Sequence, residues 1–245
     1  MNWSADFYNN ITRNFFLMDP VDDNLINFFK SLGITYTSQV LEQCCGEGTL
    51  SIALAQSLGC KTLGVDQCLS YIETASKKAK EAQVTSKFMQ YDLLSDKCVA
   101  LTHFVINWHT SWGYFEDDST NLKFLQNANK HLRSGGTFVL EYYNSDWVID
   151  NFKKSTVITK DVDGVTYTCK RESRIENQCL ISDFIIKDSS KKNLFEGSGL
   201  TKMYTKDEIV SLLCQAGFKD IQCFSDVNKS TDELNGPRLI FVSKK

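Results

Sequence analysis

The segment at residues 40–50, VLEQCCGEGTL, constrains the fold more than any other part of this chain. A short apolar run ends in an acid, turns through two glycines and leads into an apolar helical pattern. Because glycine adopts positive φ angles and lets a ligand approach the backbone, this pattern predicts a strand, a tight turn and a helix. Such a unit opens an α/β nucleotide-binding fold, and the turn residues decide which nucleotide it binds.

The turn disfavours two common kinds of nucleotide site. A dinucleotide fingerprint, Gly-x-Gly-x-x-Gly, needs a third glycine at position 51, where this chain has Ser51. Glu47 puts an acid between the two glycines, where a pyrophosphate needs bare N–H groups. A phosphate-binding Gly-Lys-Ser/Thr sequence is absent. The turn therefore favours a cofactor that carries a positive sulfonium and no phosphate, with a nicotinamide oxidoreductase kept as an alternative.

Apolar runs and helical stripes alternate over the central part of the chain. Strands are expected at residues 40–44, 61–66, 87–92, 102–107 and 137–143, with helices between them, one of which spans residues 122–132. Strict alternation of this kind predicts a mostly parallel sheet with helices on both faces. Residues 205–245 add a capping box, a helix and two closing strands. We expect residues 36–154 and 205–245 to form one Rossmann-like domain.

Two further segments differ in pattern. Residues 1–35 are helical and aromatic, and we expect either a lid over a pocket, with Trp3 or Tyr8 touching a ligand, or a face packed on the core. Residues 155–204 alternate polar and apolar side chains around Asp163-Gly164, a hairpin signal. This segment is predicted to be an inserted antiparallel β lobe that serves the substrate or a homodimer interface.

Composition excludes several classes of partner. The chain has 245 residues, 42% of them hydrophobic, with a formal net charge of −3 and no basic stripe, so a nucleic-acid partner is not expected. Its nine cysteines include no Cys-x-x-Cys pair, so we expect free thiols and no metal. No apolar run approaches the roughly 20 residues of a membrane span, and the start lacks a signal-peptide pattern. A cytoplasmic protein is the expectation.

Acidic residues end three successive expected strands. They are Glu42, Asp66 and Asp92. In open α/β sheets, ligands bind beyond the carboxyl ends of the strands, so these carboxylates should share one edge. Asp66 follows Glu42 at the spacing expected of an acid that accepts hydrogen bonds from a ribose diol, and Asp92 could accept one from an adenine amine. Capping of the following helices is the alternative role.

These motifs resemble those of the class I S-adenosylmethionine-dependent methyltransferases. The segment at 40–50 is similar to motif I of that family, residues 64–66 to its ribose strand and 90–93 to its adenine strand. Residues 107–117 and 132–137 resemble the fourth strand, its loop and the lead into the fifth strand, with a small-molecule branch as the nearest pattern. The family usually has glycine where this chain has Cys44, whose sulfur would crowd the methionine end of the cofactor.

The resemblance implies a seven-stranded sheet whose last strand is antiparallel. It also implies S-adenosylmethionine as cofactor, S-adenosylhomocysteine as product and a small-molecule acceptor methylated at O, N or C. The cofactor contacts it implies are Glu42, Cys44, Gly46, Gly48, Asp66, Gln67, Asp92, Leu93 and Asn107. We further expect His109 to act as a general base, because imidazole titrates near working pH, although a structural histidine is the alternative.

Aromatic side chains near the transferred methyl could hold a flat or cationic acceptor by stacking or cation–π contact. The expected substrate-binding residues are Tyr8, Trp108, Trp112, Tyr114 and Tyr143. Two other functions stay open from the sequence: a methyltransferase acting on protein or RNA, and a cofactor-binding interaction protein with little turnover.

Overall fold

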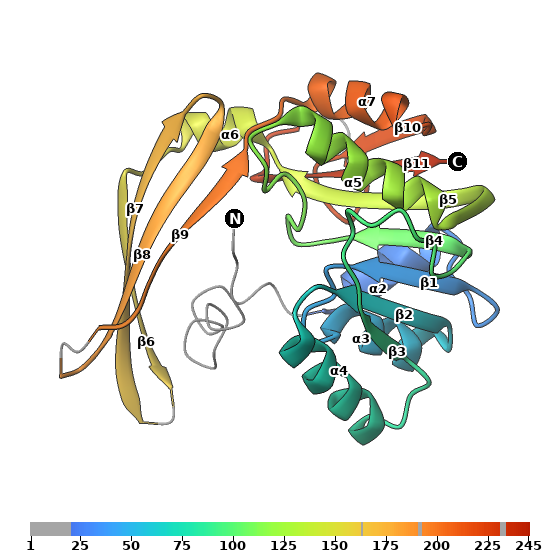
Figure 1. The fold of residues 1–245 in the computed structure, drawn as a ribbon, viewed down its shortest axis with the longest axis horizontal. Helices are drawn as coiled ribbons and strands as arrows, with labels where there is room; N and C mark the ends of the chain where they lie inside the picture. The colour runs from blue at the N-terminus through green and yellow to red at the C-terminus, as the bar shows by residue number, and fades with distance from the viewer. Residues whose placement is uncertain (1–20, 163, 191–192, 231–233) are drawn as a thin grey trace.

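The computed structural model describes residues 21–162, 164–190, 193–230 and 234–245, and these form two separate sheets (Figure 1). The larger sheet has seven strands in the order β10-β11-β5-β4-β1-β2-β3. Its strands are β1 (Gln39–Gln43), β2 (Lys61–Asp66), β3 (Lys87–Gln90), β4 (Thr102–Asn107), β5 (Leu132–Tyr143), β10 (Lys219–Phe224) and β11 (Arg238–Lys244). β1 to β5 pair in parallel, whereas β11 is antiparallel to both β5 and β10. The predicted mostly parallel sheet with an antiparallel last strand is confirmed.

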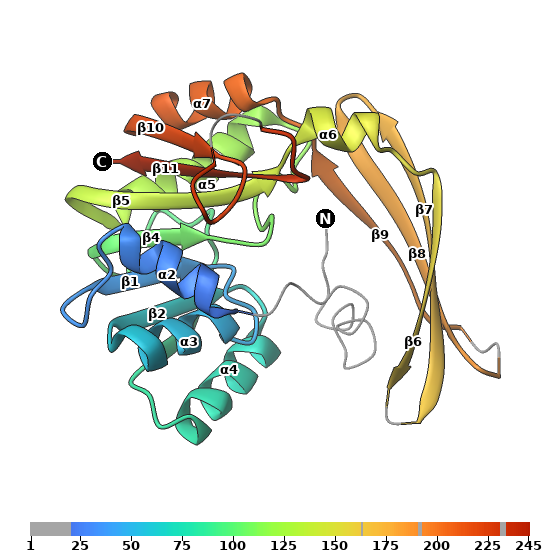
Figure 2. The same ribbon diagram turned by 180° about the vertical axis from the view of Figure 1, so that it is seen from behind.

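Helices cover both faces of this sheet, as predicted. They are α2 (Asp23–Ser31), α3 (Thr49–Leu58), α4 (Leu69–Glu81), α5 (Asp118–Lys130) and α7 (Lys206–Gln215). A further short helix, α6 (Ser145–Asp150), follows β5 near the second sheet (Figure 1). Figure 1 shows α5 in front of the sheet, and Figure 2 shows α2 and α3 on the opposite face. Side chains alternate along each strand, so Leu41 packs into the core on the α5 and α7 side and Val40 into the core on the α2 and α3 side.

Local chemistry explains several element ends. Gly59 ends α3 in the left-handed conformation, at φ +67°, where a side chain would be strained. Thr205 and Glu208 form the predicted capping box at the start of α7. The expected helix at 122–132 ends earlier, at Lys130, and His131 is its C-cap. The fifth strand accordingly begins at Leu132.

The third strand also ends earlier than expected. β3 stops at Gln90, and the chain turns immediately afterwards. Asp92 starts that turn, because its Oδ1 accepts a hydrogen bond from the Leu94 N–H at 2.9 Å. Asp92 therefore lies in a loop rather than at the end of a strand.

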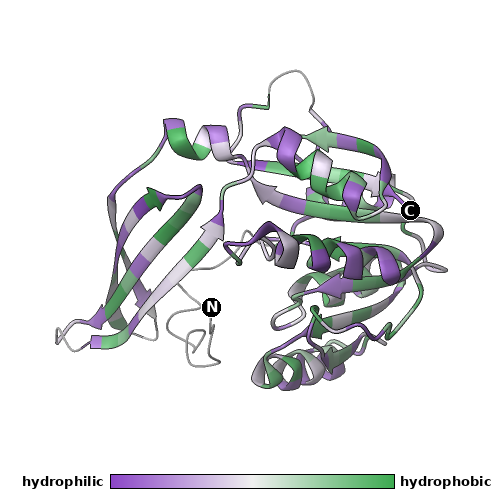
Figure 3. Cartoon of the chain, turned by 45° about the horizontal axis from the view of Figure 1, so that its top comes forward, coloured by the Kyte–Doolittle hydropathy of each residue, from purple (hydrophilic) through white to green (hydrophobic). Residues whose placement is uncertain are grey.

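The second sheet is an antiparallel meander of β6 (Ser155–Val162), β7 (Val165–Glu176), β8 (Cys179–Asp188) and β9 (Asn193–Lys202), in that order. Val162 pairs with Val165, so the predicted two-residue hairpin is present. Asn177 and Gln178, both at positive φ, form a second tight turn that the sequence did not predict. In Figure 3 apolar colour concentrates in the larger sheet, whereas polar and apolar residues alternate along this one.

The second sheet stands beside the carboxyl ends of the parallel strands and joins the α/β unit through the end of β9 (Figures 1 and 2). The Lys202 N–H donates to the Gly113 carbonyl at 2.7 Å, and the buried Tyr142 hydroxyl donates to the Lys202 carbonyl. Next to this junction, the Tyr204 ring stacks on Trp112 at 4.9 Å between centroids. The second sheet is thus tied to the loop that follows β4.

The expected N-terminal lid lies largely outside the described residues, which begin at residue 21. The described part of that segment forms α2, whose Phe28 and Phe29 are buried in the core. The lid and the proposed domain limits stay predictions. Among the described residues, no helix is long and apolar enough to cross a membrane.

Candidate active site

Three strand ends meet at one edge of the larger sheet. In the parallel register, Gln43 of β1 pairs with Val65 of β2 on one side and with Asn107 of β4 on the other. The loops that follow these strands therefore leave the sheet side by side. This edge is where open α/β sheets bind their ligands.

The two glycines of the first loop serve different purposes. Gly46 and Gly48 both have positive φ, at +51° and +76°. A Cβ on Gly46 would meet nothing within 4 Å, whereas one on Gly48 would lie 2.5 Å from the Phe88 ring. Gly46 thus borders open space that a ligand can use, and Gly48 makes room for a side chain of the protein itself.

Asp66 holds the first loop in place. Its Oδ2 accepts a hydrogen bond from the Gly46 N–H at 3.0 Å, and its Oδ1 accepts one from the Cys68 N–H at 2.9 Å. The residue is 9% exposed. Burial raises the pKa of this carboxyl group, and the backbone hydrogen bonds partly oppose the rise. Each oxygen keeps a further lone pair, so Asp66 can still accept hydrogen bonds from a ligand.

Glu42 points to the helix rather than to the loop. Its buried carboxylate accepts hydrogen bonds from both the N–H and the hydroxyl of Ser51 in the first turn of α3. Gly48, the N-cap, has no side chain to cap that turn, so Glu42 supplies the acceptor. Burial is the main cause that raises the pKa of Glu42 to about 7, against the lowering effect of the Ser51 bonds.

The acid between the glycines is neutralised. The ammonium group of Lys78 on α4 forms an ion pair with the Glu47 carboxylate. The expected repulsion of a pyrophosphate by Glu47 is therefore weaker than the sequence suggests. Ser51 occupies the position of the third glycine in a dinucleotide fingerprint. It is fully buried and hydrogen-bonded to Glu42, so the argument against a dinucleotide site at this position is unchanged.

The other expected cofactor residues around β2 and β3 occupy different environments. Gln67 and Asp92 are exposed, and the Gln67 carbonyl accepts a hydrogen bond from the Gln90 side chain at 3.0 Å. Leu93 is only 5% exposed and packs in the core. The Tyr91 N–H donates to the Asp66 carbonyl at 2.9 Å, which brings the loop carrying Asp92 next to the end of β2.

Cys44 bridges the loops after β1 and β4. It is half-buried at φ +53°, a conformation that favours the glycine usual in the resembled family. Its Sγ lies 3.5 Å from the Ser111 carbonyl oxygen, to which the thiol donates. Burial first, and then the Asp66 and Glu42 charges, raise the pKa of this thiol, so Cys44 stays protonated.

Two buried carboxamides lie side by side beneath this edge. Gln43 and Asn107 are 1% and 0% exposed, and no polar atom of either side chain has a hydrogen-bond partner. Alternation along the strands places both on the face of Leu41 and Val105. Asn107 was among the expected cofactor residues, but Gln43 was missed. The signal for Gln43 in the sequence is a polar residue two positions after Leu41, on the strand face that packs into the core.

The loop after β4 is anchored on both sides of His109. Trp108 is 8% exposed and packs edge-on against Phe29, with ring centroids 5.3 Å apart. The Thr110 N–H donates to the Glu141 carboxylate at 3.0 Å. His109 itself is half-buried at φ +59°. A left-handed histidine between two fixed neighbours is a strained arrangement of the kind found at functional sites.

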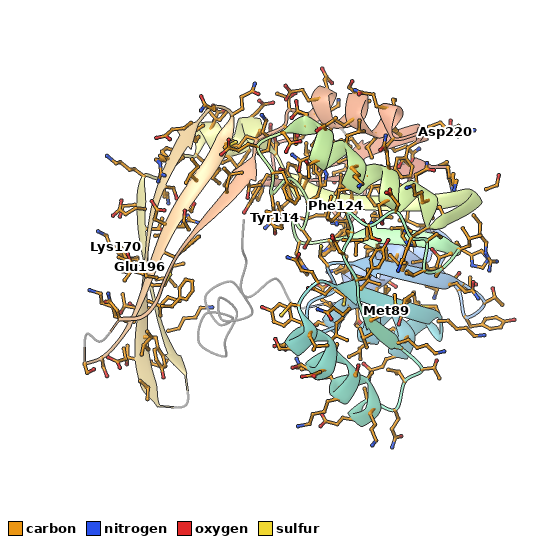
Figure 4. All side chains as sticks on the ribbon, in the orientation of Figure 1. Met89, Tyr114, Phe124, Lys170, Glu196 and Asp220 are labelled. Carbon is orange, nitrogen blue, oxygen red and sulfur yellow. The ribbon has the colours of Figure 1, made fainter. Side chains whose placement is uncertain are left out.

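The expected substrate-binding aromatics that the structure describes occupy different environments. Trp112 is 1% exposed, and its indole N–H donates to the Asn121 carbonyl at 2.9 Å, so it is a core residue like Trp108. Tyr143 is half-buried, and the Arg238 Cζ lies over its ring, 4.7 Å from the ring centroid. Tyr114 is half-buried on the side of the α/β unit that faces the second sheet (Figure 4). Tyr8 lies outside the described residues.

Other potential sites lie elsewhere or are not found. Within the ranges that the structure describes, no group of three His, Cys, Asp or Glu side chains could hold a metal ion. A cavity of about 460 Å³ lies between α5 and the loop at Ser95 and Asp96. None of its lining residues belongs to the expected site.

Comparison with known proteins identifies the central segment. Residues 40–136, from β1 into β5, match the family model described as a methyltransferase domain. This central segment is therefore similar to a methyltransferase domain, in agreement with the resemblance that its motifs carry. S-adenosylmethionine is the cofactor that this resemblance implies. A search of the curated proteins finds no match.

Solved structures share the fold of this chain over most of its length. An S-adenosylmethionine-dependent methyltransferase from Clostridium acetobutylicum is 17% identical, with a TM-score of 0.77, and the match covers 91% of this chain and 92% of that one. The CcbJ methyltransferase from Streptomyces caelestis is 16% identical, with a TM-score of 0.77 and 99% of both chains covered. The sugar N-methyltransferase KedS8 from Streptoalloteichus is 15% identical, with a TM-score of 0.67, and the match covers 85% and 80%. At these identities the likeness concerns the fold.

The residues at the carboxyl edge fit the cofactor in two respects. Open space beside Gly46 lets a ligand lie directly on the backbone of the first loop. Asp66 presents a fixed carboxylate next to that loop, as recognition of a diol requires.

Proposed function

We propose that this protein transfers a methyl group from S-adenosylmethionine to an O, N or C nucleophile of a small molecule at the carboxyl edge of the larger sheet. The observation that carries the proposal is the register that sets the ends of β1, β2 and β4 side by side. In this proposal the Gly46 loop, Asp66 and the His109 loop surround the space in which the cofactor and the acceptor meet. A small-molecule acceptor is supported by the similar fold of KedS8, a sugar N-methyltransferase.

In this proposal the cofactor lies on the first loop. Gly46 leaves the backbone open, Asp66 accepts hydrogen bonds from the ribose hydroxyls, and Asp92 reaches the adenine from its exposed turn. Asn107, at the end of β4, and Cys44 approach the methionine end. Gly48, Gln67 and Leu93 shape the surrounding loops. When bound, the cofactor supplies an electrophilic methyl group on a sulfonium.

On the acceptor side, His109 is the proposed general base. Its neighbours Trp108 and Thr110 are anchored to the core and to Glu141, so the imidazole is held by a fixed loop. A positioned imidazole that removes a proton from the acceptor typically contributes a rate factor of about 10²–10⁴. Tyr114 and Tyr143 are the half-buried aromatics left to line the acceptor space. Trp108 and Trp112 act through packing.

The second sheet is proposed as the acceptor lobe. Its last strand is hydrogen-bonded to the loop after β4 through Lys202 and Gly113, so it can fix the position of Tyr114. A lid formed by residues 1–35 and a homodimer stay predictions.

The test combines binding with turnover. Calorimetry should show that the purified protein binds S-adenosylhomocysteine, and mass spectrometry should detect that product after incubation with S-adenosylmethionine and a panel of small amines, phenols and acids. Binding without product on any acceptor would favour an interaction protein. Failure to bind either nucleoside would refute the proposal.

A further inference from the structure

Arg238 occupies a distinctive position at the carboxyl edge. It is the first residue of β11, and it pairs with Tyr143, the last residue of β5. Its guanidinium therefore lies at the same edge as the loop after β4. Thr110, next to the proposed base His109, accepts a hydrogen bond from the Arg238 Nη1.

The guanidinium is held in one orientation. Its Nη1 lies 3.1 Å from the Glu141 Oε1, and its plane lies over the Tyr143 ring at 4.7 Å. These contacts occupy one nitrogen and one face. Because the side chain is already ordered, binding a ligand would cost little further conformational entropy.

The other edge of the guanidinium is open. In the described structure, Nε and Nη2 of Arg238 have no hydrogen-bond partner, and the side chain is 38% exposed, against 7% for Glu141. The Nε–Nη2 edge is a fork that suits two oxygens of one carboxylate or phosphate. The guanidinium is thus more accessible to a ligand than the carboxylate that neutralises it.

Strand order separates this cation from the proposed cofactor site. The order β11-β5-β4-β1-β2 puts Arg238 on the far side of β4 from the Gly46 loop and Asp66. His109 and Thr110 lie between the two. An acceptor placed for attack near His109 would therefore have the cofactor on one side and Arg238 on the other.

We propose that Arg238 binds an anionic group, a carboxylate or a phosphate, on the acceptor and thereby selects acidic small molecules. This inference rests on the proposed function. Glu141 and Tyr143 position the guanidinium, and the bound anion fixes the distance between its own nucleophile and the methyl group.

The test uses anion binding by the full chain. Thermal unfolding is followed while sodium phosphate or sodium acetate replaces sodium chloride at constant ionic strength, because a ligand that binds the native state raises the melting temperature. The wild type should respond to phosphate, to acetate or to both, and which anion saturates identifies the group. Arg238→Gln should weaken the apparent affinity about tenfold or more.

Arg133→Gln is the matched control, because Arg133 lies at the opposite end of β5 and contacts Gln39 and His103. Its anion response should equal that of the wild type. If Arg238→Gln unfolds because the Glu141 charge is left unpaired, the double variant Arg238→Gln/Glu141→Gln removes both charges. An equal anion response in wild type and either Arg238 variant, or no response beyond chloride in the wild type, would overturn the inference.

Binding of S-adenosylhomocysteine separates this inference from the proposed function. Arg238→Gln should keep the wild-type dissociation constant for it. A wild-type protein that binds anions through Arg238 but no nucleoside would refute the methyl-transfer site alone.

Discussion

The buried carboxylate of Glu42 accepts two hydrogen bonds from Ser51, one from its backbone N–H and one from its hydroxyl. This pair ties the end of β1 to the first turn of α3. It fixes the loop between them, which carries Gly46. The electrostatic cost of this arrangement is measurable, because Glu42 is buried and has a raised pKa.

The stability of the protein should therefore fall as pH rises through the range in which Glu42 titrates. Its pKa is about 7 in the folded protein and 4.5 in the unfolded chain, so the native state binds the extra proton between these values. A shift of this size corresponds to about 3 kcal/mol. We expect the free energy of unfolding of Glu42→Gln to rise by that amount relative to wild type as the pH increases from 4.5 to 8. Urea unfolding at a series of pH values measures it, and a pH-independent difference would contradict it.

Asp66→Asn should weaken binding of S-adenosylhomocysteine by about 1–3 kcal/mol, the usual loss for hydrogen bonds to a charged group. The amide keeps one oxygen that can accept from a backbone N–H. It loses the negative charge that strengthens hydrogen bonds from the ribose hydroxyls. Calorimetry gives the dissociation constant. Asp96→Asn is the control, since Asp96 is an exposed acid paired with Lys130. An unchanged constant for Asp66→Asn would remove its ribose role.

Alanine at the two glycines should separate folding from binding. Gly48→Ala should destabilise the protein by about 2–4 kcal/mol, because the new Cβ strikes the Phe88 ring and φ is positive. Gly46→Ala should cost only about 1 kcal/mol but weaken nucleoside binding, because its methyl fills the open space. Unfolding curves and calorimetry on both variants decide this. Tight binding by Gly46→Ala would show that the ligand lies elsewhere.

Cys44→Gly should tighten cofactor binding. The change removes the sulfur between the loops after β1 and β4 and relieves a left-handed non-glycine residue, which costs about 1–2 kcal/mol. Cys44→Ala keeps the Cβ and the strain, so it isolates the effect of the sulfur. Weaker binding by Cys44→Gly than by wild type would mean that the thiol supports the site instead.

His109→Gln should lower kcat by about 10²–10⁴-fold with an acceptor that must lose a proton, while the dissociation constant of S-adenosylhomocysteine stays the same. With an acceptor whose nucleophile carries no proton, the same variant should keep the wild-type kcat, because no base is then needed. If kcat is unchanged with the acceptor that must lose a proton, His109 is a structural residue and its left-handed geometry serves the loop alone.

The aromatic residues show where reasoning from the sequence is weakest. Trp108 and Trp112 follow β4 directly, and nothing in the local pattern distinguishes a ring in a ligand space from a ring in the core. Trp108 meets Phe29 from α2, and Trp112 meets Tyr204 from beyond the second sheet. Both partners are distant in the chain, so only the folded structure reveals the packing.

The sequence by itself determined the order of strands and helices, the loop with Gly46 and Gly48, and the antiparallel lobe, because periodicity, glycines and caps are local properties of the chain. Only the tertiary structure decided which side chains share an environment. It paired Glu47 with Lys78, turned Glu42 towards Ser51, left Gln43 beside Asn107 and placed Arg238 over Tyr143. These relationships depend on strand register and on crossovers between distant segments, and no local pattern encodes them.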